Sequence, residues 1–163
     1  MAAEYSANAV QVVQPGASVI FTESPVPCNR GLIYHRDESG LFRLAGPTAM
    51  GVGCCRRCCC SDFPTANYYV SFHGNISVPE EPAGTVEPIS LVISIDGEND
   101  PSSLMTVTVP LVSDDFGDNV GAGVVVQVPC ICRCASVSVR NASTQPINVM
   151  NANITFSFDG VQR

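Results

Sequence analysis

The stretch Ile154-Thr155-Phe156-Ser157-Phe158 near the C-terminus decides the fold class, because apolar and polar side chains alternate along it. Alternation with a period of two is typical of a β-strand that has one face in the core and one face in water. The stretch Ser136-Val137-Ser138-Val139 repeats the pattern. Both stretches therefore predict half-buried strands.

Further strand signals recur at regular intervals along the chain, and turn residues separate them. Extended structure is expected in two strands within residues 7–21, around a turn at Gln14-Pro15-Gly16-Ala17, and in residues 32–35, 41–44, 68–72, 75–78, 89–95, 104–110, 124–128 and 147–149. No segment has apolar residues at the 3.6-residue spacing of a helix. About eight to ten short strands with Gly, Pro and Asn turns predict an all-β chain, folded as an antiparallel β-sandwich of the jelly-roll type.

The chain of 163 residues is expected to form one domain, because a chain of this length buries about 70% of its unfolded surface. Residues 13–163 are assigned to the jelly roll, and residues 1–12 to an N-terminal connecting arm that adds a strand to a neighbour's open edge. Residues 45–65 lack periodicity and predict a long cysteine-rich loop. Ser24-Pro25-Val26-Pro27 is expected to lie outside any ladder, because each proline removes a backbone donor.

The formal net charge is -7, and all eight basic residues are arginines. Such a surface repels phosphate backbones and anionic lipid, which argues against nucleic-acid and membrane-surface partners. No apolar run approaches the roughly 20 residues of a membrane helix, so membrane insertion is not expected. Met1-Ala2-Ala3-Glu4-Tyr5 lacks the basic start of a signal peptide, and no apolar segment follows it. We expect an extracellular protein, or one on the surface of a spore, cell or virion, without an evident signal peptide.

The cysteines are the most unusual feature of the composition. The nine are Cys28, Cys54, Cys55, Cys58, Cys59, Cys60, Cys130, Cys132 and Cys134. Thiols at this density are typical of cross-links or metal sites. If residues 130–134 are extended, the three sulfur atoms of that segment project to one face. We expect disulfides between the 54–60 run and the 130–134 segment, or between protomers, and an odd total leaves at least one thiol reduced or paired with another chain.

A metal site is the alternative for some of the same residues. Cys55 and Cys58, together with Cys132 and Cys134, could supply tetrahedral sulfur ligation. The Cys-x-x-Cys spacing does not recur as a second knuckle, however. We therefore expect no metal and no cofactor, and keep a cysteine-ligated metal protein as the third hypothesis.

The sequence does not arrange a recognisable catalytic site. His35 lies on an expected hairpin and His73 at a strand end, where a satisfied or exposed turn residue is the usual interpretation. No group stands at a recognisable distance to orient a Cys–His nucleophile pair. The stretch Asp114-Asp115-Phe116-Gly117-Asp118-Asn119 lacks the ligand spacing and closing Glu of a calcium loop, so we expect a solvated loop. We expect no enzymatic activity.

Four segments carry a resemblance to a known fold. They are Tyr69-Val70-Ser71-Phe72, Leu91-Val92-Ile93-Ser94-Ile95-Asp96-Gly97, Val137-Ser138-Val139-Arg140-Asn141 and Ala152-Asn153-Ile154-Thr155-Phe156. From residue 68 onward the chain resembles the tumour-necrosis-factor-like jelly roll, in particular the C-terminal head of the collagen-like glycoprotein of the spore exosporium. The resemblance implies a homotrimer in which one sheet of each protomer packs around the threefold axis. The chain departs from that glycoprotein by having no Gly-X-Y stalk and by its cysteines.

These observations lead to one principal functional hypothesis. We expect a non-enzymatic structural protein that self-assembles into a homotrimer or filament on a spore, cell or virus surface, reinforced by disulfides. Similar folds occur in virus capsids, phage fibre heads and spore appendages, as the resemblance implies. The alternative is a phage fibre or head-decoration protein that binds a glycan or receptor through its loops.

Overall fold

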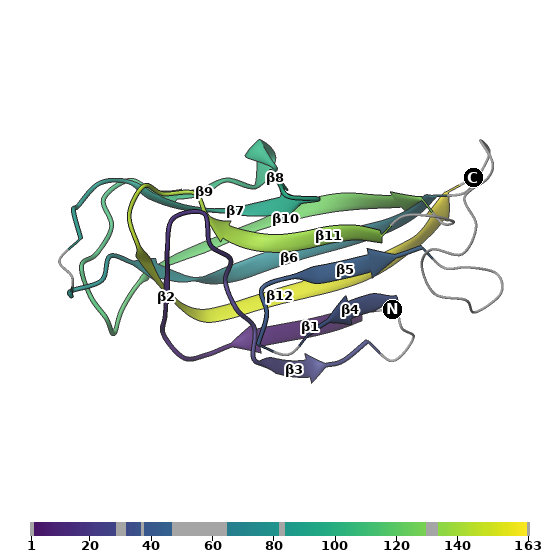
Figure 1. The fold of residues 1–163 in the computed structure, drawn as a ribbon, viewed down its shortest axis with the longest axis horizontal. Coiled ribbons are helices and arrows are strands. Elements are labelled where there is room, and N and C mark those ends of the chain that lie inside the picture. Colours follow the sequence, from purple (N-terminus) through teal and green to yellow (C-terminus); the bar gives the residue numbers. More distant parts are fainter. Residues whose placement is uncertain are drawn as a thin grey trace.

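The computed structural model describes residues 2–28, 32–36, 38–46, 65–81, 84–129 and 134–162. In this part, the chain forms two antiparallel sheets that pack face to face, and its helical structure is one short 3-10 turn, η1 (Pro101–Ser103) (Figure 1). The predicted all-β antiparallel sandwich is therefore confirmed. The predicted cysteine-rich loop falls mainly on residues 47–64, which lie outside the described residues.

Each sheet contains six strands, and their order is not the order of the chain. Sheet A runs β10 (Asp118–Pro129), β6 (Thr65–Ser77), β12 (Ile147–Gln162), β1 (Ala2–Ala7) and β3 (Glu23–Val26), and β2 (Gln11–Val13) also pairs with β12. Sheet B runs β4 (Ile33–His35), β5 (Phe42–Ala45), β11 (Cys134–Asn141), β7 (Ile89–Ile95) and β8 (Glu98–Asn99), and β9 (Met105–Val107) also pairs with β7. Strands far apart in sequence are thus neighbours, as in a jelly roll.

The long central strands of sheet A are continuous where the sequence predicted interruptions. β6 joins the two segments expected at 68–72 and 75–78, and its pairing with β10 runs without a break from Asp118 opposite Ile76 to Pro129 opposite Thr65. Gly74 lies at the predicted interruption, where a side chain would be tightly placed against its neighbours. A Cβ at this position would lie 3.2 Å from the ring of Phe72 and 3.4 Å from the main chain of Ala152.

The N-terminal region differs most from the prediction. Residues 2–7, expected to belong to a connecting arm, form β1, which pairs with β12 inside sheet A. The expected pairing of two strands within residues 7–21 is wrong, because β2 pairs with β12 instead. Further along the segment, Ser18 makes an isolated bridge to Arg140, and Phe21 makes one to Ser39. This segment therefore passes from one sheet to the other. An exchange of β1 between protomers would require this strand to leave a position between β12 and β3.

The proline-containing segment after residue 22 is also different from the expectation. β3 contains Pro25 and pairs with β1, which contradicts the prediction that this segment lies outside any ladder. Its position explains the tolerance, since β3 is the edge of sheet A and a proline nitrogen can face away from the ladder there. The register between β1 and β3 is irregular, so the ladder is short.

The hairpin predicted from residues 32–35 and 41–44 is confirmed, whereas the turn that the sequence predicts over residues 96–101 is shorter, because Glu98 and Asn99 form β8. β4 and β5 form the expected hairpin, with Tyr34 opposite Arg43. β7 and β8 are joined by Asp96 and Gly97, whose φ angles of 51° and 87° are those of a two-residue hairpin turn. The Asp96 carboxylate accepts a hydrogen bond of 2.7 Å from the backbone N–H of Ser136, which ties this turn to β11. β9, by contrast, is shorter than the strand expected at 104–110.

The core between the sheets is centred on aromatic rings from both layers. Phe42 of β5 is fully buried, and its ring centroid lies 4.8 Å from that of Phe156, 4.9 Å from that of Tyr5 and 5.3 Å from that of Phe21. The last three residues come from β12, β1 and the segment that crosses between the sheets. Aromatic side chains bury large apolar areas, and tilted pairs at such distances stabilise beyond that area. This cluster joins sheet A to sheet B.

Phe42→Ala is expected to lower the free energy of unfolding by about 3–5 kcal/mol, because it leaves a cavity among rings that cannot all collapse into it. Chemical denaturation followed by circular dichroism measures the change. Phe116→Ala provides the control, since Phe116 is 72% exposed and its replacement is expected to change stability by about 0.5 kcal/mol or less. Equal losses in both variants would contradict the assignment of Phe42 to the core.

Candidate functional site

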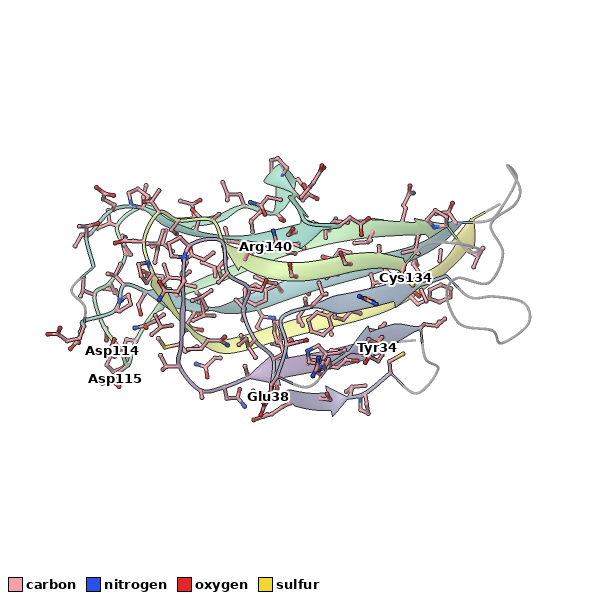
Figure 2. The ribbon with its side chains drawn as sticks, in the orientation of Figure 1. Tyr34, Glu38, Asp114, Asp115, Cys134 and Arg140 are labelled. Atoms are coloured by element: carbon pink, nitrogen blue, oxygen red, sulfur yellow. The ribbon has the colours of Figure 1, made fainter. Side chains whose placement is uncertain are left out.

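Both cysteine runs are joined to the same end of the sandwich. β5 ends at Ala45 and β11 begins at Cys134, and these two residues are directly paired. β10 ends at Pro129, which is paired with Thr65 at the start of β6. Only four residues separate Pro129 from Cys134, so the strands that lead into and out of both runs end together (Figures 1 and 2). The fold therefore brings the flanks of the two runs to one place.

The cysteine predictions themselves lie mostly outside the described residues. Seven of the nine positions fall there, including Cys55, Cys58 and Cys132 of the alternative metal site. The remaining two, Cys28 and Cys134, are partly buried. The described residues contain no group of three or more His, Cys, Asp or Glu side chains that could hold a metal ion. The disulfide connectivity stays a prediction.

His35 has a structural position in the hairpin. Its ring stacks on Phe42 with centroids 4.4 Å apart and an interplanar angle of 18°, and it also lies 4.9 Å from the ring of Tyr5. Its Nε2 atom donates to the carbonyl oxygen of Ser39 at 2.9 Å, which fixes the tautomer, because a carbonyl can only accept. The Nδ1 atom is buried and has no hydrogen-bond partner among the described residues. His35 therefore closes the aromatic cluster at the hairpin.

The acidic segment 114–119, expected to be a loop, ends in β10, because Asp118 and Asn119 pair with β6. Asp114 and Asp115 lie at the opposite end of the sandwich from Cys134, as their labels in Figure 2 show. Asp114 accepts hydrogen bonds from the side-chain amide of Asn148 at 2.8 Å and from the backbone N–H of Glu80 at 3.1 Å. The Asp114 carboxylate thus connects β12 to the segment that follows β6 at this end of the sandwich. Asp115 is exposed.

The second histidine lies on a surface that the sequence analysis did not identify as a site. We define the outer face of sheet A as three cross-strand rows on β10, β6 and β12. The rows are Val125, Tyr69 and Ser157; Gly123, Ser71 and Thr155; and Gly121, His73 and Asn153. Residues directly opposite each other on paired strands share one face of the sheet. Alternation with the buried Val70, Phe72 and Val124 places these rows on the side away from the core.

Two large apolar side chains lie exposed at the first row of this face. Tyr69 is 50% exposed and Val125 is 62% exposed, although both belong to long, well-paired strands. Gly123, one row further, leaves room for the tyrosine. A Cβ at Gly123 would lie 2.3 Å from the hydroxyl oxygen of Tyr69 and 2.8 Å from Cζ of its ring. The tyrosine therefore lies over the glycine, and the two together make the surface flat.

The outer face of sheet A also has no charged carboxylate or guanidinium group in its three rows, in a protein whose net charge is -7. Ser71 and Thr155 contact each other through their hydroxyl groups at 3.5 Å. The first acidic residue beyond the rows is Glu4 of β1, opposite Thr155. The outer face of sheet B differs, because it carries the guanidinium groups of Arg43 and Arg140. The two outer faces of the sandwich are thus chemically distinct.

An uncharged, flat sheet surface with an exposed tyrosine has the features of the centre of a protein interface. Such centres are depleted in charged residues and enriched in tyrosine relative to the rest of a protein surface. The sequence contained this signal in the alternation around Tyr69 and in the repeated glycines of Gly121-Ala122-Gly123. It could not be interpreted there, because the pairing of β10 with β6 is needed to place the glycines beside the tyrosine.

Comparisons with solved structures identify the fold. The globular domain of a zebrafish complement 1qA protein aligns with a TM-score of 0.58 and 12% identity over 99% of this chain and 98% of its own. The tumour necrosis factor Eiger from S. frugiperda aligns with a TM-score of 0.60 and 10% identity, covering 100% and 94%. Murine APRIL aligns with a TM-score of 0.57 and 9% identity, covering 100% of both chains.

The chain therefore has the tumour-necrosis-factor-like jelly roll that its sequence resembled. The resemblance to the exosporium glycoprotein in particular stays a prediction. No family model matches the sequence, and no curated protein matches it either. At identities near 10%, the structural likeness establishes the fold alone. The described part of the chain contains no helix long and apolar enough to cross a bilayer.

The pH dependence of stability tests whether the Tyr5 phenol is buried in the aromatic cluster around Phe42. Burial raises the pKa of its phenol above the ordinary value of 10.0, the charge of Cys28 adds to this, and a hydrogen bond with the Cys28 main chain opposes it. Because the folded state favours the neutral phenol, this contribution to stability is complete below pH 10 and is lost as the pH rises through the raised pKa.

The free energy of unfolding of the wild type minus that of Tyr5→Phe is therefore expected to be constant from pH 7 to about 9.5 and to fall above pH 10. Urea denaturation in matched buffers measures this difference. A difference that stays constant up to pH 11 would contradict the assigned burial of the phenol.

Proposed function

We propose that this protein is a non-enzymatic structural subunit that self-associates through the outer face of sheet A. The observation that carries the proposal is the exposed pair Tyr69 and Val125 on a flat surface without charged carboxylate or guanidinium groups. An exposed apolar area on the face of a sheet, here at the edge strand β10 and its neighbour β6, is costly in water unless it is covered, and a second copy of the same chain can cover it. In the homotrimer that the family resemblance implies, one sheet of each protomer is covered by the neighbouring copies in this way.

The small residues of the face support a close approach of the backbones. Gly121 and Gly123 present no side chain, while Ser71, Ser157 and Thr155 present short hydroxyl groups that can hydrogen-bond across an interface. Three copies of this face around a threefold axis would bury Tyr69 and Val125, with Glu4, whose carboxylate accepts a hydrogen bond from Asn153, at the margin of the face. His73 lies in the last row, between Gly121 and Asn153.

We further propose that the cysteine-bearing end fastens the assembly. The flanks of both cysteine runs meet at one end of the sandwich, where Cys134 begins β11 opposite Ala45. The fold has a large apolar core that does not require cross-links for folding, so disulfides here would reinforce the loop or join protomers. Such reinforcement suits a protein on an extracellular or particle surface, such as that of a spore, cell or virion.

Val125→Asp is expected to convert the assembled protein to a monomer, because three aspartates would meet at the interface and remain unpaired there. Sedimentation velocity at several concentrations measures the assembly state, and circular dichroism checks that the sheet is intact. Val109→Asp is the matched control, since it makes the same substitution at a valine that is 76% exposed outside the face. Monomeric wild-type protein, or Val125→Asp that assembles like Val109→Asp, would refute the proposed interface.

The cross-links are tested separately by electrophoresis in denaturant with and without reductant, after free thiols have been alkylated. Bands at multiples of the 17.2 kDa chain that disappear on reduction are expected for disulfides between protomers. A faster-migrating monomer that slows on reduction is expected for disulfides within the chain. A monomer of unchanged mobility under both conditions would exclude both arrangements.

A further inference from the structure

The outer face of sheet B carries a pocket that takes no part in the proposed self-association. It has a volume of about 400 Å³, and the described residues that line it are Tyr34, Arg36, Ser39, Leu41 and Arg43. All five belong to the β4–β5 hairpin and the residues that join its strands. Tyr34 and Arg43 are a directly opposite cross-strand pair, and both are exposed while their neighbours Ile33, Phe42 and Leu44 are buried. The pocket therefore opens on the side away from the core.

The charge of the described residues that line this pocket is opposite to that of the whole protein. Arg36 and Arg43 are two of only eight basic residues in a chain with a net charge of -7, and none of the described residues that line the pocket is acidic. Glu38, at the tip of the same hairpin, is exposed and has a positive φ of 59°, and Figure 2 shows it apart from Tyr34. Two guanidinium groups at one pocket select planar oxyanions, which they bind through paired N–H donors.

The remaining lining limits the size and shape of the ligand. A volume of about 400 Å³ is near the lower end of the range of small-molecule sites and is too small for a folded partner. Tyr34 is 64% exposed, so its ring offers a flat apolar surface with a hydroxyl at its end. Leu41 adds an apolar contact, and the Ser39 hydroxyl, whose hydrogen bonds to Leu41 are long at 3.4 Å, is available as a donor.

We propose that this pocket binds a carboxylate-bearing sugar, such as a uronic acid residue at the end of a glycan. The arginines would hold the carboxylate, Tyr34 would stack on the apolar face of the sugar ring, and Ser39 would bond a ring hydroxyl. A plain anion would use only the arginines, and a neutral sugar only the tyrosine and the serine. The combination of all three in one hairpin favours a ligand that has both a charge and a ring.

The position of the pocket makes this site independent of the self-association face. The pocket lies on the outer side of sheet B, whereas the self-association face is the outer side of sheet A, and the two sheets are the opposite layers of the sandwich. Each protomer of an assembly would therefore display its own pocket outward. Several weak sites on one particle give a higher apparent affinity for a polyvalent glycan than a single site does.

Binding of glucuronate, glucose and acetate to the full-length protein, measured by isothermal titration calorimetry at low ionic strength, tests the proposal. Glucuronate is expected to bind with a dissociation constant in the millimolar range, and glucose and acetate roughly tenfold or more weakly. Arg43→Gln and Tyr34→Ala are each expected to weaken glucuronate binding roughly tenfold. Arg140→Gln is the matched control, because it removes one guanidinium from the same sheet outside the pocket, and its affinity is expected to stay within twofold of the wild type.

Three outcomes would overturn the proposal. The first is the absence of glucuronate binding up to 50 mM. The second is equal affinity for acetate and glucuronate, which would indicate a site for anions only. The third is an affinity for glucuronate that Arg43→Gln leaves unchanged. Val125→Asp separates this proposal from the proposed function. A monomeric Val125→Asp variant that still binds glucuronate supports both, whereas loss of binding in a folded monomer would show that the pocket needs the assembly and is not complete in one chain.

Discussion

The pairing of β12 with β6 is the interaction on which the rest of the structure depends. β12 is the longest strand, and it pairs with β6 along nearly its whole length while its other edge holds β1 and β2. Two bulges, one near Asn151 and one near Asp159, adjust the register so that long strands can stay paired while the sheet twists. Without this ladder, sheet A would separate into β10 and β6 on one side and β12 with β1, β2 and β3 on the other.

The same ladder creates the two faces of sheet A. Inward residues of β12 such as Ile154 and Phe156 are fully buried, and Phe156 meets Phe42 of the other sheet. Outward residues are short and polar on β12 but include Tyr69 on β6 and Val125 on β10. A sheet with one solvent-exposed face needs no apolar residues on that face, so the exposed side chains of Tyr69 and Val125 indicate that a partner covers them. The fold, the core and the proposed interface are thus consequences of one register.

The two outer faces divide the proposed roles between the sheets. The three rows on β10, β6 and β12 offer a surface without carboxylate or guanidinium groups that a second copy of the chain could cover, and sheet B offers a hairpin pocket with two guanidinium groups suited to a small anion with a ring. The end that carries Cys134 supplies a third element, and it adjoins sheet B, since Cys134 pairs with Ala45 two residues from Arg43. Assembly and ligand display would then use opposite faces of one small domain, with the fastening at one end.

The sequence by itself determined the fold class, the β4–β5 hairpin and the turn at Asp96 and Gly97, because period-two alternation and turn residues are local signals. It did not reveal β1, the crossing between sheets near Phe21, or the edge strand with Pro25, because short strands with few apolar residues depend on the partner that covers them. The candidate sites were hidden for the same reason. Tyr69, Gly123 and Val125 become one surface only through cross-strand pairing, and only tertiary structure decides which of the two sides of a strand is buried and which meets water.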